Sequence, residues 1–227
     1  MEKKFFRDFY VEFHKRRHKY GKTTSDKSFE LIKEIIGSGK KVLDLGCRDG
    51  SLTKHYVDRN EVVGVDIDDV ALSICKKNLG IQTFHLDLNE QLPFDDSSFD
   101  VVVAGEIIEH LIFPESFVRE IHRVLKPKGI FCGSTPNVTR IRNRLQFLFG
   151  DTPFVNDTAH FRYFSYSTLI ELFKRYFSKV VITPFGGHII GNKKFGILKI
   201  GVPITPNTPL WLGRLFSANL FWKAIKE

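Results

Sequence analysis

Cysteine, methionine and tryptophan are scarce in this chain, and their scarcity excludes several kinds of protein. The 227 residues include three cysteines, one methionine and two tryptophans. An odd number of cysteines without C-x-x-C spacing excludes a disulfide framework and a cysteine-based metal centre. No metal site is therefore expected. The same cysteine usage fits a reducing compartment, so we expect a cytoplasmic protein.

Long apolar runs are also missing. The opening MEKKFFRDFYVEFHKRRHKYGK places charges between its apolar residues, so no hydrophobic core of a signal peptide forms. No stretch approaches the roughly 20 apolar residues that a membrane-spanning helix needs. The longest apolar runs, such as 101–104, are typical of buried strands.

Positive charge is in excess, with 34 Lys and Arg against 26 Asp and Glu and a net charge of +8. Basic clusters occur at 14–19 and 140–144. This surplus fits a phosphorylated small molecule, an anionic lipid surface or RNA, although charge runs more often form a solvated face. The apolar and basic stretch 209–216 fits either peripheral membrane contact or a short helix over the sheet.

Short segments rich in Val, Ile and Leu alternate with helical segments along most of the chain. This alternation is typical of βαβ units, in which helices cover both faces of a parallel sheet. The last segment, 218–226, is expected to be an edge strand that can run antiparallel. Strands are predicted at 41–45, 62–65, 83–86, 101–104, 130–134, 179–183 and 218–226, and helices at 28–36, 51–59, 70–78, 114–125 and 167–176.

The predicted fold is therefore a doubly wound, Rossmann-like α/β domain with a seven-stranded, mostly parallel sheet. An N-terminal helical cap at 1–40 precedes the main domain at 41–227. The alternation breaks at about 137–165, where arginines, aromatics and turn residues predict an inserted lid. A Gly/Pro-rich excursion covers 184–210.

The first segment that indicates chemistry is VLDLGCRDG at 42–50, a strand followed by a glycine turn that opens a helix. Ligands of open α/β sheets bind at such strand ends. The dinucleotide fingerprint G-x-G-x-x-G is broken, because Arg48 stands where the second glycine is needed and the third glycine is missing. Asp44 and Asp49 would repel a pyrophosphate and suit an ammonium group.

A second acidic residue, Asp66, follows the next strand about 20 residues beyond the glycine turn. A carboxylate in this place can accept hydrogen bonds from both hydroxyls of a ribose. The placement fits any ligand with an adenosine moiety, and by itself it does not separate NAD from S-adenosylmethionine.

As a linked set, the motifs resemble class I S-adenosylmethionine-dependent methyltransferases of the methyltransferase type 11 group, which includes the ubiquinone-pathway O-methyltransferases. One residue departs from the pattern: the family usually has a glycine where this chain has Arg48. The matching runs are VLDLGCRDG at 42–50, VVGVDID at 62–68, FHLDLNEQLPFDDSSFDVVVAGEIIEHL at 84–111, REIHRVLKPKGIFCGSTPN at 119–137 and, more loosely, HFRYFSYSTLIELF at 160–173.

The resemblance implies S-adenosylmethionine as the cofactor, bound at the carboxyl ends of the first four strands. Asp66 would bind the ribose, and Asp87 would accept the adenine amino group. The other implied residues are Asp44, Gly46 and Gly50 around the methionine part, Ile67 and Leu88 against the adenine, and Gly105 and Glu106 beside the transferring methyl group.

Two histidines are candidate bases for removing a proton from the acceptor. Methyl transfer from a sulfonium needs an in-line nucleophile and no general acid, so positioning and a base supply the catalysis. His110, just beyond the fourth strand, is the first candidate, and His160 in the lid is the second. The alternatives are structural packing of His110 and anchoring of the lid by His160. Arg162 suits an acidic acceptor group or the surface.

The acceptor is expected to be a small molecule, apolar or anionic. A tRNA or protein methyltransferase is a second hypothesis, which the basic clusters favour and the lack of an appended RNA-binding domain disfavours. A third is a non-catalytic module that binds S-adenosylmethionine. An NAD oxidoreductase is disfavoured by the broken glycine fingerprint.

Overall fold

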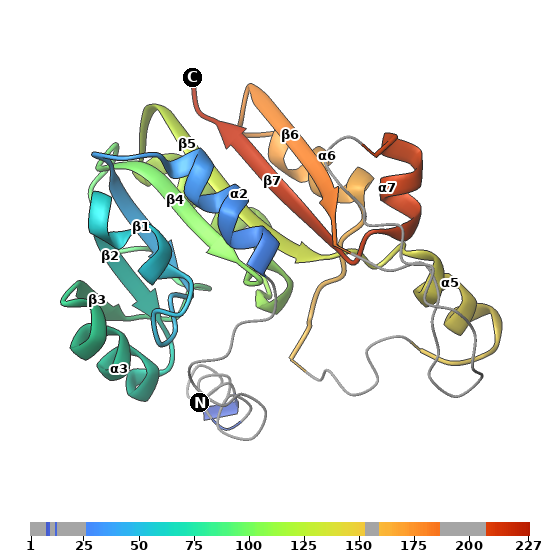
Figure 1. Ribbon diagram of the computed structural model, residues 1–227, viewed down its shortest axis with the longest axis horizontal. Helices are drawn as coiled ribbons and strands as arrows, with labels where there is room; N and C mark the ends of the chain where they lie inside the picture. Colours follow the sequence, from blue (N-terminus) through green and yellow to red (C-terminus); the bar gives the residue numbers. More distant parts are fainter. Residues whose placement is uncertain (1–7, 10–11, 13–25, 153–158, 187–207) are drawn as a thin grey trace.

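A computed structural model describes residues 8–9, 12, 26–152, 159–186 and 208–227 of the chain. Most of the expected N-terminal cap, and most of the excursion at 184–210, lies outside these residues. The described part of the cap is the helix α2 (Asp26–Ile36), which crosses one face of the sheet in Figure 1. Its Ile32 and Ile36 are buried against that face.

A seven-stranded mixed sheet forms the centre of the molecule, with the strand order β3-β2-β1-β4-β5-β7-β6. The expected seven-stranded α/β fold is confirmed, and β7 is antiparallel to both its neighbours. The strands are β1 (Lys41–Leu45), β2 (Glu61–Asp66), β3 (Gln82–His85), β4 (Phe99–Gly105), β5 (Leu125–Pro136), β6 (Lys179–Phe185) and β7 (Asn219–Ile225).

The expectation that the last strand lies at the edge of the sheet is wrong. β7 lies between β5 and β6, and β6 is the edge strand. The physical reason is that β7 is apolar on both faces. Trp222 is buried on one face and Phe221 on the other, and a strand that buries both faces needs a neighbour on each side.

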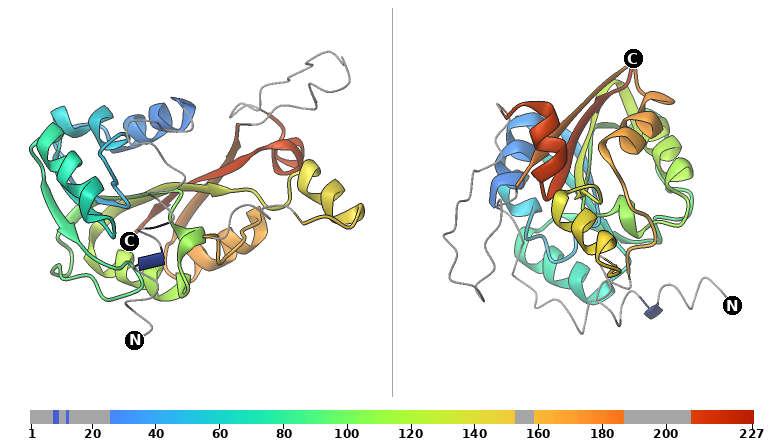
Figure 2. Two further views of the ribbon diagram at one scale, coloured as in Figure 1. Left: turned by 90° about the horizontal axis from the view of Figure 1, so that it is seen from below. Right: turned by 90° about the vertical axis from the view of Figure 1, so that its right-hand side faces the viewer.

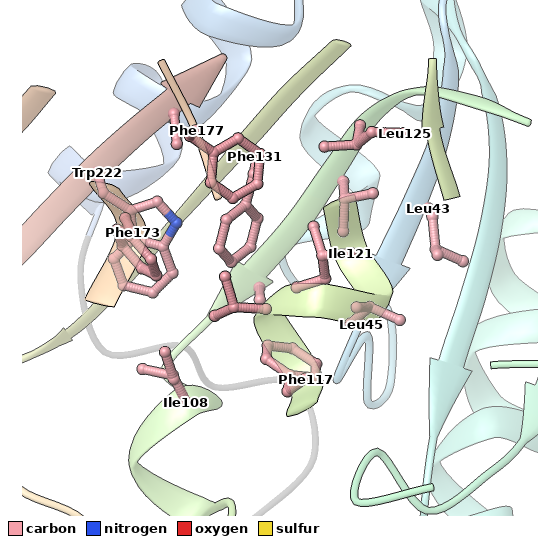
Figure 3. Close-up of a cluster of buried hydrophobic side chains, with 14 of the residues drawn as sticks. Leu43, Leu45, Ile108, Phe117, Ile121, Leu125, Phe131, Phe173, Phe177 and Trp222 are labelled. Carbon is pink, nitrogen blue, oxygen red and sulfur yellow. The ribbon is translucent and has the colours of Figure 1, made fainter. Parts of the chain in front are cut away.

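Helices cover both faces of the sheet (Figure 2). α2 and α3 (Asp69–Leu79) pack on one face, while α4 (Pro114–Val124) and α6 (Tyr166–Lys174) pack on the other. Figure 3 shows the larger core. The ring of Phe131 in β5 contacts three other aromatic rings there: Phe173 of α6, Phe177 just after α6, and Trp222 of β7.

Local signals set the ends of these helices. The Asp68 carboxylate accepts from two backbone N–H groups at the start of α3, and Gly80 ends the helix in a left-handed conformation. Ser165 and Thr168 form a reciprocal capping box at the start of α6. Pro114 begins α4, where its missing N–H costs nothing.

The helix predicted at 51–59 is instead two short 3-10 turns, Thr53–His55 and Val57–Arg59. The hydroxyls of Thr53 and Tyr56 both donate to the buried Asp44 carboxylate, each at 2.6 Å. These two bonds pull the segment against the end of β1, and Tyr56 leaves helical geometry with φ −137°. A side-chain contact therefore overrides the helical pattern.

The predicted lid contains one described helix, α5 (Ile141–Leu148), beside α7 (Leu210–Phe216) at one end of the molecule (Figure 1). Residues 153–158 of the lid lie outside the described part. α7 accounts for the stretch 209–216 as a short helix, with Trp211 exposed. Among the helices of the described residues, none has the length and apolar character to cross a membrane.

Candidate functional site

The site lies at the carboxyl ends of β1 and β4, where the strand order reverses. β1 pairs with β2 on one side and with β4 on the other, so the connections leave in opposite directions from this point. Such a switch point is where open α/β sheets bind ligands. Four carboxylates at the carboxyl ends of β1 to β4 form what we name the strand-end cluster: Asp44, Asp66, Asp87 and Glu106.

The glycine turn after β1 is packed closely against the end of β4. Gly46 has φ +77°, and a Cβ there would overlap Cδ1 of Ile107. Gly50 has φ +79°, and a Cβ there would lie 2.6 Å from Cδ1 of Leu79. Backbone conformation therefore favours glycine at both positions, and a Cβ there would require the Ile107 and Leu79 side chains to move.

Arg48, which stands at the usual glycine of this turn, keeps the left-handed backbone with φ +51°. The backbone N–H of Arg48 donates to Oδ2 of Asp66 at 2.9 Å. The departure from the family pattern therefore leaves the path of the turn intact, and the backbone of the turn holds the acidic residue of the next strand.

Asp66 ends β2 as a carboxylate that is only 7% exposed. Its other oxygen accepts from the N–H of Asp68 at 2.9 Å. Burial raises the pKa of Asp66 to about 6, although the two backbone N–H bonds lower it. The side chain is thus a fixed hydrogen-bond acceptor at the edge of the switch point.

Asp44 lies deeper, beneath the turn, and is 1% exposed. Burial raises its pKa, and the hydroxyls of Thr53 and Tyr56 oppose that shift. Because both hydroxyls bond to Oδ2, this carboxylate anchors the 3-10 turns to β1. Thr53 and Tyr56 were not predicted from the sequence, since their role depends on a contact across the turn.

Asp87 follows β3, and its Oδ1 accepts from the backbone and the side-chain amide of Asn89 at 2.9 and 3.0 Å. Asn89 in turn accepts from the N–H of Ile112 at 2.9 Å. This bond joins the loop after β3 to the loop after β4. Ile67 and Leu88 lie beside the same loops, partly buried.

Glu106 follows Gly105 at the end of β4 and has φ +57°. Its Oε1 accepts from the Ser134 hydroxyl at 2.6 Å, and its N–H donates to the Ser134 carbonyl at 2.8 Å. Burial raises the pKa of Glu106. β5 therefore fixes this carboxylate, with its neighbour Gly105 partly exposed.

The two candidate bases are brought together across a long gap in sequence. The His110 and His160 rings lie 4.8 Å apart between centroids and at 60° to each other. Residues 159–165, which we name the strap, carry His160 over the turn Ile108–His110. Glu109, which was not among the predicted site residues, lies with both histidines and is 2% exposed.

Arg162 fixes the strap to the loop after β4. Its Nε and Nη2 donate to the carbonyl of Ile112 at 3.2 and 2.8 Å, and its N–H donates to the carbonyl of Glu109 at 3.0 Å. The side chain is exposed. In this arrangement the guanidinium holds protein backbone.

The strand-end cluster has the chemistry to hold an adenosine-bearing sulfonium. Asp66 and Asp87 are acceptors for hydroxyl and amino groups, and Glu106 and Asp44 supply negative charge that suits a cation. The tight glycine turn brings backbone rather than side chain up to the switch point. The residues present therefore fit S-adenosylmethionine, the cofactor that the sequence resemblance implies.

Comparisons with known proteins support the sequence resemblance. Residues 43–133 match the family model described as a methyltransferase domain. A probable S-adenosylmethionine-dependent methyltransferase of Mycolicibacterium smegmatis is 36% identical over 138 residues, which cover 60% of this chain and 50% of that protein. A ubiquinone biosynthesis O-methyltransferase of Pasteurella multocida is 31% identical over 117 residues, covering 45% and 48%. The chain thus spans about half the length of these curated relatives.

Solved structures with similar folds cover nearly the whole chain. The YcgJ protein from Bacillus subtilis aligns with a TM-score of 0.67 at 17% identity, over 89% of this chain and 99% of its own. A SAM-dependent methyltransferase from Archaeoglobus fulgidus aligns with a TM-score of 0.64 at 19% identity, over 96% and 99%. At sequence identities of 17% and 19%, this structural similarity concerns the fold alone.

Proposed function

We propose, on the premise that residues 43–133 are a methyltransferase domain, that this chain binds S-adenosylmethionine and transfers its methyl group to a small molecule. The single observation that carries the proposal is the strand-end cluster at the switch point. It joins acceptors for an adenosine to negative charge for a sulfonium within the same fold that the relatives share.

Each residue of the cluster has a proposed task. Asp66 accepts hydrogen bonds from the ribose hydroxyls, and Asp87 accepts one from the adenine amino group. Ile67 and Leu88 pack against the adenine. The turn from Gly46 to Gly50, with Asp44 beneath it, and the pair Gly105 and Glu106 surround the methionine part and the methyl group.

The chemistry needs an in-line approach and a route for one proton. When bound, the sulfonium supplies an electrophilic methyl group whose leaving sulfur is neutral. The residues after β4 and the strap, including His110 and His160, are proposed to face the acceptor and to keep water from the reacting atoms. Holding the reactants in line can contribute on the order of 7 kcal/mol or more to lowering the barrier.

The proposal also covers the lid over the acceptor and the compartment in which the reaction takes place. The segment at 137–165 is proposed to act as a lid over an apolar or anionic acceptor, with basic side chains on α5 suited to negative charge. We place the reaction in the reducing cytoplasm. Cys47, Cys75 and Cys132 support this because all three are buried free thiols.

Calorimetry on the purified chain tests the cofactor. We expect binding of S-adenosylmethionine and of S-adenosylhomocysteine, and no binding of NADH, because the dinucleotide fingerprint is broken. A folded sample that binds neither sulfur compound would refute the proposal. Binding without any methyl transfer would instead point to a non-catalytic module.

A labelling screen tests the acceptor. Cell extract is separated into small-molecule, RNA and protein fractions and incubated with the chain and methyl-labelled S-adenosylmethionine. Label is expected in the small-molecule fraction. Label confined to RNA or protein would exclude the proposed acceptor class while keeping the methyl transfer.

A further inference from the structure

Three side chains with metal-binding atoms gather beyond the end of β4. Glu109 and His110 come from the turn Ile108–His110, and His160 comes from the strap. One donor atom of each lies within 4.8 Å of the others. We propose that this group, named here the strap site, binds a divalent transition-metal ion that holds the acceptor. The sequence predicted no metal site, because the cysteines lack metal-binding spacing and His160 lies 50 residues from His110 in the chain.

Several bonds fix the two segments to each other. The N–H groups of Phe161 and Arg162 both donate to the carbonyl of Glu109 at 3.0 Å. His110 is bonded through Nδ1 to the carbonyl of Ala159 at 2.9 Å, across 49 residues of sequence. The three candidate ligands are therefore held by backbone contacts on both sides, as a preorganised metal site requires.

The hydrogen bond of His110 also sets its tautomer. A carbonyl oxygen can only accept, so Nδ1 carries the proton and Nε2 carries the lone pair. A metal-binding histidine commonly donates its other ring N–H to a backbone carbonyl in this way. Glu109 has the equivalent support, because the hydroxyl of Thr135 donates to Oε2 at 3.0 Å.

The burial of the group is uneven. Glu109 is 2% exposed and Thr135 is fully buried, whereas His110 and His160 are partly exposed. An ion at the strap site would thus have the protein core on one side and an open side toward the histidines. Two imidazoles and one carboxylate form a donor set that suits Zn²⁺, Fe²⁺ or Co²⁺ better than Mg²⁺ or Ca²⁺.

The task of the ion rests on the proposed function. Three protein ligands leave coordination positions for an oxygen atom of another molecule, and a divalent ion lowers the pKa of the oxygen that it binds. The strap site would then hold a hydroxyl group of the acceptor and favour release of its proton to solvent on the partly exposed side of the site. The oxygen would form a bond to the methyl carbon as the carbon–sulfur bond breaks, and neutral S-adenosylhomocysteine would leave. The acceptor class is accordingly a small molecule that is methylated on oxygen, with His110 and His160 as ligands of the ion.

Cobalt titration of the full, untagged chain tests the site without any need for activity. Metal is first removed with a chelator, and Co²⁺ is added while visible absorption is followed. We expect absorption bands of bound Co²⁺ that saturate at one equivalent. His160→Ala should weaken this binding at least about 100-fold, and His122→Ala, which removes a histidine from α4, should leave it unchanged.

A second variant, which conserves the shape of a ligand side chain, distinguishes a lost metal ligand from a misfolded protein. Glu109→Gln keeps the shape of the side chain and can still accept from Thr135, but it removes the charge, so it should also weaken Co²⁺ binding. Circular dichroism confirms that each variant is folded. No bound-Co²⁺ absorption in the native chain, or equal binding by native chain and His160→Ala, overturns the metal site.

Calorimetry with S-adenosylmethionine on the same samples separates this inference from the proposed function. His160→Ala that loses Co²⁺ but keeps cofactor affinity supports the metal site. If the native chain binds the cofactor and not Co²⁺, the metal site is wrong and the proposed function stands. If it binds Co²⁺ and not the cofactor, the proposed function is wrong and the acceptor-holding role falls with it.

Discussion

The strand-end cluster and the strap site lie at the same end of the sheet but are assembled in different ways. In the strand-end cluster, each carboxylate lies in a strand or within two residues of its end, as Asp66 and Glu106 do. In the strap site, bonds of the residues on either side of His160 place it beside its partners from a segment far along the chain. The next two N–H groups of the strap donate to the Glu109 carbonyl, and the preceding carbonyl is bonded to the His110 ring. The first depends on the order of strands, and the second on a single tertiary contact between two loops.

Because of this difference, the two regions should respond differently to substitutions. The ladder of the sheet fixes β1, β2 and β4 on both sides and the edge strand β3 on one side, so a side chain at a strand end keeps its place when a neighbour changes. The strap is held by a few hydrogen bonds, each contributing about 1 kcal/mol. Changes to the strap should therefore affect the acceptor side and leave the cofactor side alone.

The strongest effect that we predict comes from a core residue that lies in neither region. Trp222 of β7 is fully buried, with ring centroids 5.4 Å from Phe131 and 5.2 Å from Phe173. Trp222→Ala should lower the free energy of unfolding by about 3–5 kcal/mol, because it leaves a large cavity. Denaturation with urea measures the loss.

Trp222→Phe is the matched control. The Trp222 Nε1 has no hydrogen-bond partner among the described residues, so the phenyl ring gives up volume but no hydrogen bond there. It should cost clearly less than the alanine variant. Equal losses for both variants would contradict the packing argument.

Asp66→Ala tests the cofactor side by removing one carboxylate of the strand-end cluster. Loss of the ribose acceptor should weaken S-adenosylmethionine binding by about 1–3 kcal/mol, since hydrogen bonds to a charged group are the stronger kind. Asp69→Ala, an exposed neighbour in the first turn of α3, should bind normally. Calorimetry gives both affinities, and unchanged binding by Asp66→Ala would remove this residue from the site.

The raised pKa of Asp66, about 6, adds a pH dependence to that binding. The ionised carboxylate is the acceptor, so affinity is highest above pH 6 and falls as the pH drops through 6. At pH 5 about a tenth of the carboxylates stay ionised, so the Kd should rise roughly tenfold relative to pH 7.5. Asp66→Asn cannot titrate and should remove this component. A flat native profile would indicate an ordinary carboxyl pKa.

The smallest expected effect concerns the strap. Arg162→Ala removes two hydrogen bonds to the carbonyl of Ile112, and it should slow methyl transfer by an amount equal to about 0.5–1.5 kcal/mol. Cofactor affinity should stay the same, because Arg162 is connected to the strand-end cluster only indirectly, from Ile112 through Asn89 to Asp87. Arg175→Ala, a control on an exposed arginine just after α6, should change neither quantity. A parallel loss of cofactor affinity in Arg162→Ala would show that the two regions are not independent.

The order of residues along the chain is enough to predict the α/β class, the seven strands and the acidic residues at strand ends. These follow from signals within about ten residues of chain, namely apolar runs, glycine turns and an aspartate such as Asp66 directly after a strand. Parallel strands bring their carboxyl ends to one edge, so local order is enough to gather that cluster.

Three other features arise only when the chain is folded, and the structure was needed to find them. It placed β7 inside the sheet, because Phe221 and Trp222 need cover on opposite faces. It turned 51–59 into 3-10 turns, because Asp44 binds two hydroxyls from that segment. It set His160 beside Glu109 and His110. Each outcome depends on contacts between residues distant in sequence or on opposite sides of a turn, which no local periodicity records.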